Sequence, residues 1–269
     1  MQCEKEKAGR LHRHLSELRL PTIRRCYQET AIAARRDNWE YESYLLELAE
    51  REREERRNAR TARLLKDSKL PLEKNLKAFN RKRLPRKVDT QLTQLLKGTF
   101  LDHKENVLAF GNPGSGKTHL LCAVAQELVH QGRQVRFTPC NLLVQELLIA
   151  KRDLTLARVL KRYAKYEALI IDDIGYVQQS REEMEVLFTL LADRYERGSI
   201  MLTSNLPFSK WEQIFKDPMT TAAAIDRLVH HSVILELNMP SYRLEQSQKA
   251  QAQSEPRKNS PQEETPWNA

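Results

Sequence analysis

The chain lacks the features of membrane-spanning and secreted proteins. None of its 269 residues belongs to an uninterrupted apolar run of 18 or more, and the first 30 residues are rich in charge without the apolar segment of a signal peptide. We therefore expect no membrane span, no membrane partner and a cytoplasmic location.

Cysteine is scarce, and its spacing excludes the common thiol sites. The four cysteines, Cys3, Cys26, Cys122 and Cys140, form no C-x-x-C pair and have no histidine at zinc-finger spacing. They indicate ordinary side chains in a reducing compartment rather than disulfides or a metal site. No internal repeat is evident.

Glycine is also scarce, which makes its one cluster informative. Three of the eight glycines lie in the stretch 111–118, which fits G-x-x-x-x-G-K-[ST] at every fixed position. The stretch follows the apolar run 107–110 and precedes the helical pattern 119–130, as a phosphate-binding P-loop requires. Its residues are Gly111, Asn112, Pro113, Gly114, Ser115, Gly116, Lys117 and Thr118.

The residue types in this loop suit a nucleoside triphosphate. Glycines let backbone N–H groups converge on a phosphate, Lys117 adds a positive charge over the β- and γ-phosphates, and the Thr118 hydroxyl can bind Mg²⁺. The loop therefore predicts binding of ATP or GTP with Mg²⁺.

Short apolar segments alternate with helical patterns through the rest of the chain. Five strands are predicted, and strands that alternate with helices indicate an α/β fold with a parallel sheet. The predicted strands are 106–110, 134–138, 168–171, 199–203 and 233–237.

Two of these strands end in polar residues that fit the same nucleotide site. Asp172 follows the apolar run 168–171 and is placed to hold Mg²⁺, and Asp173 is placed to orient or deprotonate the attacking water. Asn205 follows the strand 199–203, and its amide is expected to point toward the γ-phosphate. Asp173 is shorter than the glutamate more often found at this place, which leaves a slow or structural nucleotide site open.

Positive charge is concentrated in the N-terminal third. The chain carries a net charge of +9, and residues 51–87 contain 15 basic and 5 acidic residues, a net of +10. Such a block is typical of contact with a nucleic-acid backbone.

The basic residues fall in two groups. The N-terminal third reads as helical from His12 to Leu70, with a break at Asp37–Asn38 and a second run near 41–66. Helical spacing lines several arginines of that run along one face, and an extended basic segment follows. The predicted DNA contacts are Arg53, Arg56, Arg57, Arg60, Arg63, Arg81, Lys82 and Arg83. A solvated helix face, offset by Glu52, Glu54 and Glu55, is the alternative.

These motifs together resemble the AAA+ ATPases, within the group that holds the IstB transposition helper and the DnaC and DnaI helicase loaders. The resemblance covers roughly residues 10–245. It includes Arg194–Gly198, Thr203–Pro207 with Trp211, Asp226–Leu228 and Pro240–Arg243 beside the loop and strand motifs.

The resemblance implies a sheet order of 5-1-4-3-2, homo-oligomers and ATP hydrolysis at subunit interfaces. It implies that Arg227 is the finger inserted toward the γ-phosphate of a neighbouring subunit, with an ion pair to Asp226 as the alternative. It implies that Arg243 contacts phosphate as a second sensor. His230 and His231 are not at metal-ligand spacing and are interpreted as packing or interface residues.

The predicted domains are a helical domain 1–70, a basic linker and helix 71–104, an ATPase domain 105–245 and a disordered tail 246–269. The 32 residues after Leu237 are mostly polar, and we expect them to lack the helical lid that usually follows the fifth strand. We expect residues 88–105, just before the P-loop, to close the adenine pocket instead.

The leading hypothesis is an ATPase that assembles on double-stranded DNA and recruits or activates a transposase. A helicase loader that grips a replicative helicase is the first alternative. A DNA-binding scaffold with a structural nucleotide site is the second.

Overall fold

The structure is a computed structural model that describes residues 2–175, 180–215, 217–242, 244–245 and 247. The chain divides into two compact units, Met1–Ser68 with Val129–Arg133 and Lys69–Leu128 with Gln134–Ala269. The predicted tail lies almost entirely outside the described residues. Among the helices described, none is long and apolar enough to cross a bilayer.

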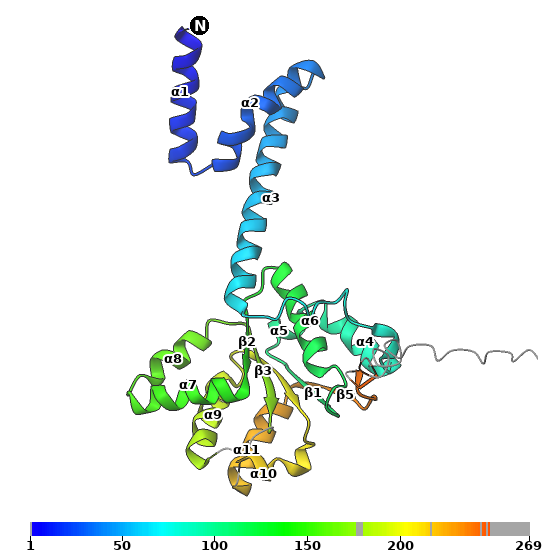
Figure 1. Ribbon diagram of the computed structural model, residues 1–269. Coiled ribbons are helices and arrows are strands. Elements are labelled where there is room, and N and C mark those ends of the chain that lie inside the picture. Colours follow the sequence, from blue (N-terminus) through cyan, green and yellow to red (C-terminus); the bar gives the residue numbers. More distant parts are fainter. Residues whose placement is uncertain (1, 176–179, 216, 243, 246, 248–269) are drawn as a thin grey trace, which may run out of the picture. The chain divides into compact units, whose positions relative to one another are not determined.

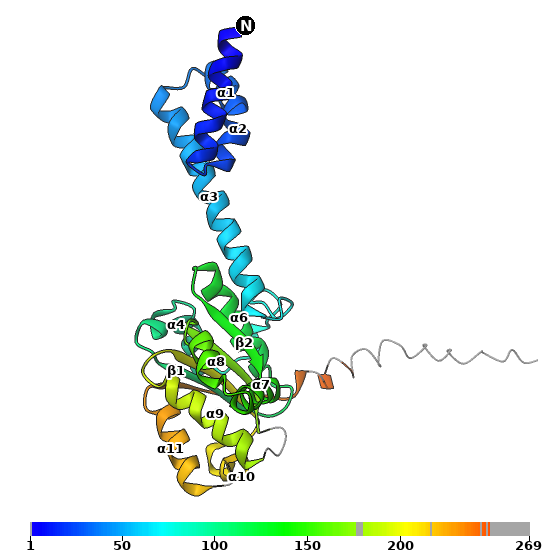
Figure 2. The same cartoon turned by 90° about the vertical axis from the view of Figure 1, so that its left-hand side faces the viewer.

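The first unit is built from three helices: α1 (Gln2–Glu17), α2 (Pro21–Arg36) and α3 (Tyr41–Ser68). Helix α2 packs against both α1 and α3 (Figures 1 and 2). Pro21 occupies the first turn of α2, where its missing N–H costs no hydrogen bond. The chain reverses after α1 at Arg19, which has a positive φ of 55°. The sequence indicated the break after α2, and Pro21 was expected in a first helical turn, as the structure has it.

A buried carboxylate joins α3 to the start of α2. Glu52 is 4% exposed and accepts hydrogen bonds from the backbone N–H groups of Thr22 (2.8 Å) and Ile23 (3.1 Å). The Nε of Arg56 donates to the same carboxylate at 2.8 Å. Glu52 therefore caps the positive end of the α2 dipole and also pairs with Arg56 of the arginine face.

The second unit begins with a segment that precedes the sheet. It contains the 3₁₀ turn η1 (Arg81–Arg83), α4 (Arg86–Leu95) and α5 (Thr99–Asp102). The single helix expected near 90–101 is two helices, because Gly98 takes a left-handed conformation (φ 76°) between them. The apolar face of α4 is buried and packs against the last strand of the sheet.

A five-stranded parallel sheet forms the centre of the second unit. Its order is β2-β3-β4-β1-β5, which is the predicted order read from the other edge. In the register, Val107 of β1 pairs with Met201 of β4 on one side and Val233 of β5 on the other. The strands are β1 (Asn106–Gly111), β2 (Val135–Pro139), β3 (Ala168–Ile174), β4 (Ser199–Ser204) and β5 (Ser232–Leu237).

Helices cover both faces of the sheet, and Figure 1 shows α6 on the opposite side from α7 and α9. The helices of this part are α6 (Lys117–His130), α7 (Cys140–Arg152), α8 (Leu156–Tyr163), α9 (Arg181–Arg194), the 3₁₀ turn η2 (Phe208–Lys210), α10 (Glu212–Phe215) and α11 (Pro218–Val229). The α7, α9 and α11 side encloses the main core. Its fully buried members include Leu108, Leu143, Leu147, Leu169, Leu187, Leu190 and Leu202.

Three cysteines have described side chains. Cys26, Cys122 and Cys140 are buried free thiols. Burial raises the pKa of the Cys122 thiol to about 12, so this thiol stays protonated and unreactive at neutral pH.

Candidate nucleotide site

The loop between β1 and α6 has a backbone that side chains would obstruct. A Cβ on Gly111 would lie 2.3 Å from the carbonyl oxygen of Leu237. Gly114 has φ +78°, and a Cβ there would lie 2.1 Å from the Ser241 hydroxyl oxygen. These two positions therefore require glycine, one for close approach to β5 and one for its left-handed conformation.

Lys117 is held down onto its own loop. It is 6% exposed, and its Nζ donates to the carbonyls of Gly111 and Asn112, both at 2.9 Å, and to Asn205 Oδ1 at 2.6 Å. The nearby Ser115 Oγ is buried and has no hydrogen-bond partner among the described residues. A phosphate in the loop would provide an acceptor for both groups.

Asp172 joins the loop helix to two neighbouring strands. Its Oδ1 accepts hydrogen bonds from the hydroxyls of Thr118 and Thr203, each at 2.7 Å. Thr203 Oγ1 also accepts from the backbone N–H of Asp173 at 2.7 Å. Sequence reasoning placed Thr203 at a strand end without giving it a role, and the structure shows that it links the Asp172 carboxylate to the backbone of Asp173.

Asp173 and Asn205 meet beyond this link. Asp173 has a positive φ of 66° at a bulge in the β3–β4 pairing, and its Oδ1 accepts from Asn205 Nδ2 at 2.9 Å. A buried side chain holds the turn after Asn205 in place: Trp211 donates from Nε1 to the carbonyl of Leu206 at 3.1 Å. The predicted residues Lys117, Asn205 and Asp173 therefore form one hydrogen-bonded chain.

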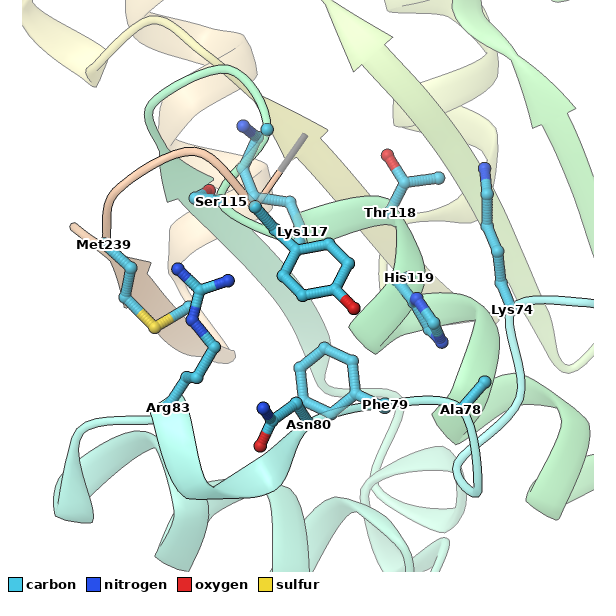
Figure 3. A pocket seen from close by; sticks show the side chains of 13 residues that line it. Lys74, Ala78, Phe79, Asn80, Arg83, Ser115, Lys117, Thr118, His119 and Met239 are labelled. Atoms are coloured by element: carbon cyan, nitrogen blue, oxygen red, sulfur yellow. The ribbon is translucent and has the colours of Figure 1, made fainter. Parts of the chain in front are cut away.

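A cavity opens beside the loop and receives side chains from before and after the sheet. Phe79 stands over the loop, with its ring 3.5 Å from the position of a Cβ on Gly116, and meets the His119 ring edge-on at 5.1 Å. Figure 3 shows Phe79 and Arg83 reaching from the segment before α4 toward Lys117. The cavity is lined by Lys74, Ala78, Phe79, Asn80, Arg83, Gly114, Ser115, Gly116, Lys117, Thr118, His119, Met239 and Tyr242.

This lining differs from the segment expected to close the pocket. Residues 88–105 do not line the cavity, because Val88, Leu92 and Leu95 are buried against the sheet and Gln91 donates to the carbonyl of Ile234. The segment 74–83 takes that place. No sequence motif identified the segment 74–83 as part of the pocket, and its one distinctive feature was Phe79, an aromatic residue among basic ones.

Arg83 connects this segment to the chain that follows β5. Its guanidinium pairs with Glu245 at 2.6 Å, donates to the carbonyl of Pro240 at 3.2 Å and lies 5.1 Å from the centre of the Tyr242 ring. The backbone N–H of Tyr242 in turn donates to the carbonyl of Gly114. Arg83 therefore lines the nucleotide cavity, and its predicted contact with DNA stays a prediction. Arg243 lies outside the described residues.

The remaining predicted DNA contacts lie on two units. Arg53, Arg56, Arg57, Arg60 and Arg63 are exposed on α3 of the first unit, and Arg56 is also bound by Glu52 and by the carbonyl of Arg19. Arg81 and Lys82 are exposed on η1 of the second unit. Arg81 pairs with Asp89 at 2.7 Å.

Arg227 lies at the edge of the sheet opposite the loop. Asn106 begins β1 and donates to the carbonyl of Leu228 at 3.1 Å, whereas the loop follows the far end of β1. The length of that strand separates the two edges by about 17 Å. The Arg227 guanidinium lies 5.0 Å from the ring centre of Phe188 rather than on Asp226. Arg227 is therefore too far from Lys117 to act on the loop of its own chain.

A phosphate-binding loop, paired strand-end carboxylates and the order 5-1-4-3-2 define an AAA+ P-loop fold. The family described as IstB-like ATP binding protein matches residues 13–250. The chain therefore belongs to the IstB-like ATP-binding family.

Two curated relatives extend over most of the chain. A putative insertion sequence ATP-binding protein of Sinorhizobium fredii is 41% identical over 87% of this chain and 79% of its own length. The insertion sequence IS5376 putative ATP-binding protein of Geobacillus stearothermophilus is 35% identical over 87% of this chain and 94% of its own length.

Solved structures agree on the fold at lower identity. DnaA from Aquifex aeolicus bound to AMPPCP matches with a TM-score of 0.54 and 17% identity, over 69% of this chain and 56% of that one. DnaI matches with a TM-score of 0.51 and 21% identity, over 64% of this chain and 94% of that one. These likenesses show the fold alone.

Proposed function

We propose that this protein is an ATPase of DNA transposition, which assembles on double-stranded DNA in its ATP-bound form and recruits or activates a transposase. The observation that carries the proposal is the placement of Arg227, at the sheet edge opposite a complete nucleotide loop. A site whose finger comes from a second chain makes nucleotide binding and assembly one event.

The residues around the loop divide the chemistry among them. Lys117 binds the β- and γ-phosphates, and Asp173 orients the attacking water. Asn205 contacts the γ-phosphate and, through its hydrogen bonds, couples the presence of that phosphate to the positions of Lys117 and Asp173. Arg227 of the next chain neutralises the charge that develops on the transferred phosphoryl group, an effect worth about 10³ to 10⁵ in rate in related chemistry.

Thr118 and Asp172 would hold Mg²⁺. Their side-chain oxygens lie 2.7 Å apart, and hydroxyl and carboxylate oxygens are the donors that this hard cation prefers. When bound, Mg²⁺ supplies charge neutralisation on the phosphate oxygens. The role of Thr203 is to keep the Asp172 carboxylate turned toward Thr118.

The exposed arginines of α3 support the DNA part of the proposal. Glu52 points inward to cap α2, so it neutralises Arg56 alone and leaves Arg57, Arg60 and Arg63 facing solvent. Such a row suits phosphates, which fix a protein on DNA without reading its sequence.

The transposase part rests on the relatives. Both curated relatives are named as ATP-binding proteins of insertion sequences, and each aligns with 87% of this chain. The helicase-loader alternative rests on likeness of fold to DnaI at 21% identity. A transposase gene directly upstream would favour the transposition role.

The test is ATP-dependent DNA binding as a function of salt. The double variant Arg60→Glu with Arg63→Glu should weaken binding and lower the slope of log K against log salt by about one unit for each phosphate that the protein no longer neutralises. Lys161→Glu with Lys165→Glu reverses two exposed charges elsewhere and should leave the slope unchanged. Lys117→Ala should abolish the ATP dependence.

An unaltered slope in the α3 variant would mean that the arginine row faces something other than DNA. ATP-dependent assembly that survives Lys117→Ala would remove the nucleotide switch. Supplying the partner transposase on preassembled DNA complexes then tests recruitment, and a transposase that binds DNA equally well without this protein would contradict it.

A further inference from the structure

Three side chains that can bind a metal meet at the sheet edge opposite the nucleotide loop. Glu196 lies in the turn between α9 and β4, and His230 and His231 lie between α11 and β5. Each offers one ligand atom, and these atoms all lie within 4.8 Å of one another. The sequence separates Glu196 from the histidines, which is why spacing along the chain did not suggest a site.

The turn that carries Glu196 is held in place by a buried arginine. Arg194 is 2% exposed, and its guanidinium donates to the carbonyls of Tyr163 (2.8 Å) and Ser199 (3.0 Å). Gly198 packs so closely on this group that a Cβ there would lie 2.5 Å from the guanidinium. Glu196 itself has φ +59°. Its position therefore comes from a rigid turn and not from a loose loop.

His230 already has the orienting partner that metal-binding histidines usually have. Its Nδ1 lies 2.9 Å from the hydroxyl of Tyr195. In the tautomer that donates the Nδ1 proton to this oxygen, Nε2 keeps its lone pair for a cation. The ring of His231 lies with its centre 4.0 Å from that of His230.

The local field also favours a cation. The cluster follows the C-terminal ends of α9 and α11, and each helix end carries partial negative charge. Glu196 and these two helix ends face the positively charged side chains of Arg227 and Lys104, which line the same hollow as Glu196 and His231.

We propose that Glu196, His230 and His231 bind a first-row transition-metal dication, for which Zn²⁺ is the probe. Two imidazoles and one carboxylate suit Zn²⁺, Ni²⁺ or Cu²⁺ and not Mg²⁺, which prefers oxygen donors. Metal bonds of 2.0–2.1 Å place tetrahedral ligands about 3.3 Å apart, a distance that three exposed side chains reach by small rotations. The fourth position is left for water or for a group on another molecule.

This site is separate from the nucleotide site and does not depend on the proposed function. One of its ligands, His230, lies three residues after Arg227 and caps the C-terminal end of the helix that carries Arg227. A bound metal would join that end of α11 to the turn before β4. Metal occupancy is thus a means of fixing the helix that carries Arg227.

Calorimetric titration of the full chain with Zn²⁺, in excess Mg²⁺ and without nucleotide, tests the proposal. We expect one Zn²⁺ per chain. His231→Asn and Glu196→Gln should each weaken the affinity at least about tenfold, and Tyr195→Phe, which removes the orienting hydroxyl, about tenfold. His130→Asn removes an exposed histidine elsewhere and should bind Zn²⁺ like the unmodified chain.

Spectroscopy of the unmodified chain avoids any concern about the folding of variants. Cobalt(II) in the same site should give a spectrum of nitrogen and oxygen ligands, and zinc-edge absorption should show two imidazoles. The proposal is overturned if no stoichiometric binding occurs, if a sulfur-to-cobalt band indicates a cysteine site, or if His231→Asn and Glu196→Gln bind as the unmodified chain does.

Discussion

The hydrogen bond between Lys117 and Asn205 leads to two opposite predictions for nucleotide affinity. In the structure Asn205 Oδ1 accepts from the Lys117 ammonium at 2.6 Å. A phosphate must compete with this acceptor for the same ammonium. Asn205→Ala removes the competitor, so ADP, which has no γ-phosphate for Asn205 to contact, should bind more tightly.

The size of the effect follows from the kind of bond and its surroundings. A hydrogen bond to a charged group contributes about 1.5–3 kcal/mol. Because Asn205 is half-buried, water partly replaces the missing acceptor, and we expect the lower end of that range. The affinity for ADP should therefore rise about tenfold. Asn205→Asp keeps the shape but offers Lys117 a carboxylate, so ADP should bind more weakly than to the unmodified chain.

Fluorescence or calorimetric titration with ADP measures both variants, and single-turnover hydrolysis of ATP provides the second readout. Removal of the amide that positions Asp173 should slow hydrolysis by about 10² to 10³ in Asn205→Ala. Tighter ADP binding with slower hydrolysis is a combination that general damage to the site does not produce. If both variants weaken ADP binding equally, the Lys117–Asn205 bond does not compete with the nucleotide.

Three further changes give separate tests. Arg227→Ala should keep nucleotide affinity and lose about 10³ in the rate of hydrolysis, whereas the control Arg197→Ala at the same edge should keep both. Mixing Arg227→Ala chains with Lys117→Ala chains should restore part of the activity; a mixture as inactive as its components would contradict a finger supplied by a neighbour. Phe79→Ala should lower the affinity for ADP about tenfold, as expected if the adenine base stacks on the Phe79 ring, and should leave the affinity for inorganic triphosphate unchanged. Equal losses of affinity for both ligands would mean that the ring supports the loop instead. For Glu52, burial raises the pKa, but the hydrogen bonds from Ile23, Arg56 and Thr22 outweigh it and hold the pKa below its usual value, so its stabilisation is present at neutral pH and is lost as pH falls through that lowered value. Glu52→Gln should lower the free energy of unfolding by about 1–3 kcal/mol at pH 7. In urea titrations the difference should shrink as the pH falls through the lowered pKa of Glu52, and a difference independent of pH would refute the assignment.

The centre of the nucleotide site was predictable because it follows from parallel strands. Carboxyl ends of neighbouring strands meet at one edge, so Asp172, Asp173 and Asn205 were expected near Lys117 once the strands were identified. The structure brings them together: Lys117, Asn205 and Asp173 form one hydrogen-bonded chain, and Asp172 accepts from Thr118, the residue after Lys117. What each residue does in hydrolysis remains a prediction.

The outer wall of the cavity was not predictable, because it depends on contacts between distant segments without a motif. Arg83 meets Glu245 across 162 positions of sequence, and composition alone made Arg83 look like one more DNA contact. The same holds for Glu52, which looked like a counter-charge on the α3 surface. It is a buried cap because α2 folds back to within hydrogen-bond reach of α3.

The loop and Arg227 lie at opposite edges of the sheet, so any contact between the loop of one chain and Arg227 of another is head-to-tail. Such a contact joins two different surfaces of neighbouring chains. In a row of chains, the loop of the chain at one end therefore has no Arg227 from a neighbour, and Arg227 of the chain at the other end has no neighbouring loop to contact. If Arg227 acts as proposed, the two ends would differ chemically: nucleotide at the first end would lack the arginine needed for rapid hydrolysis, while the arginine at the second end would act only on an added chain that carries nucleotide. Growth and loss of subunits would therefore follow different rates at the two ends, and a partner that recognises one end can tell which way the row points.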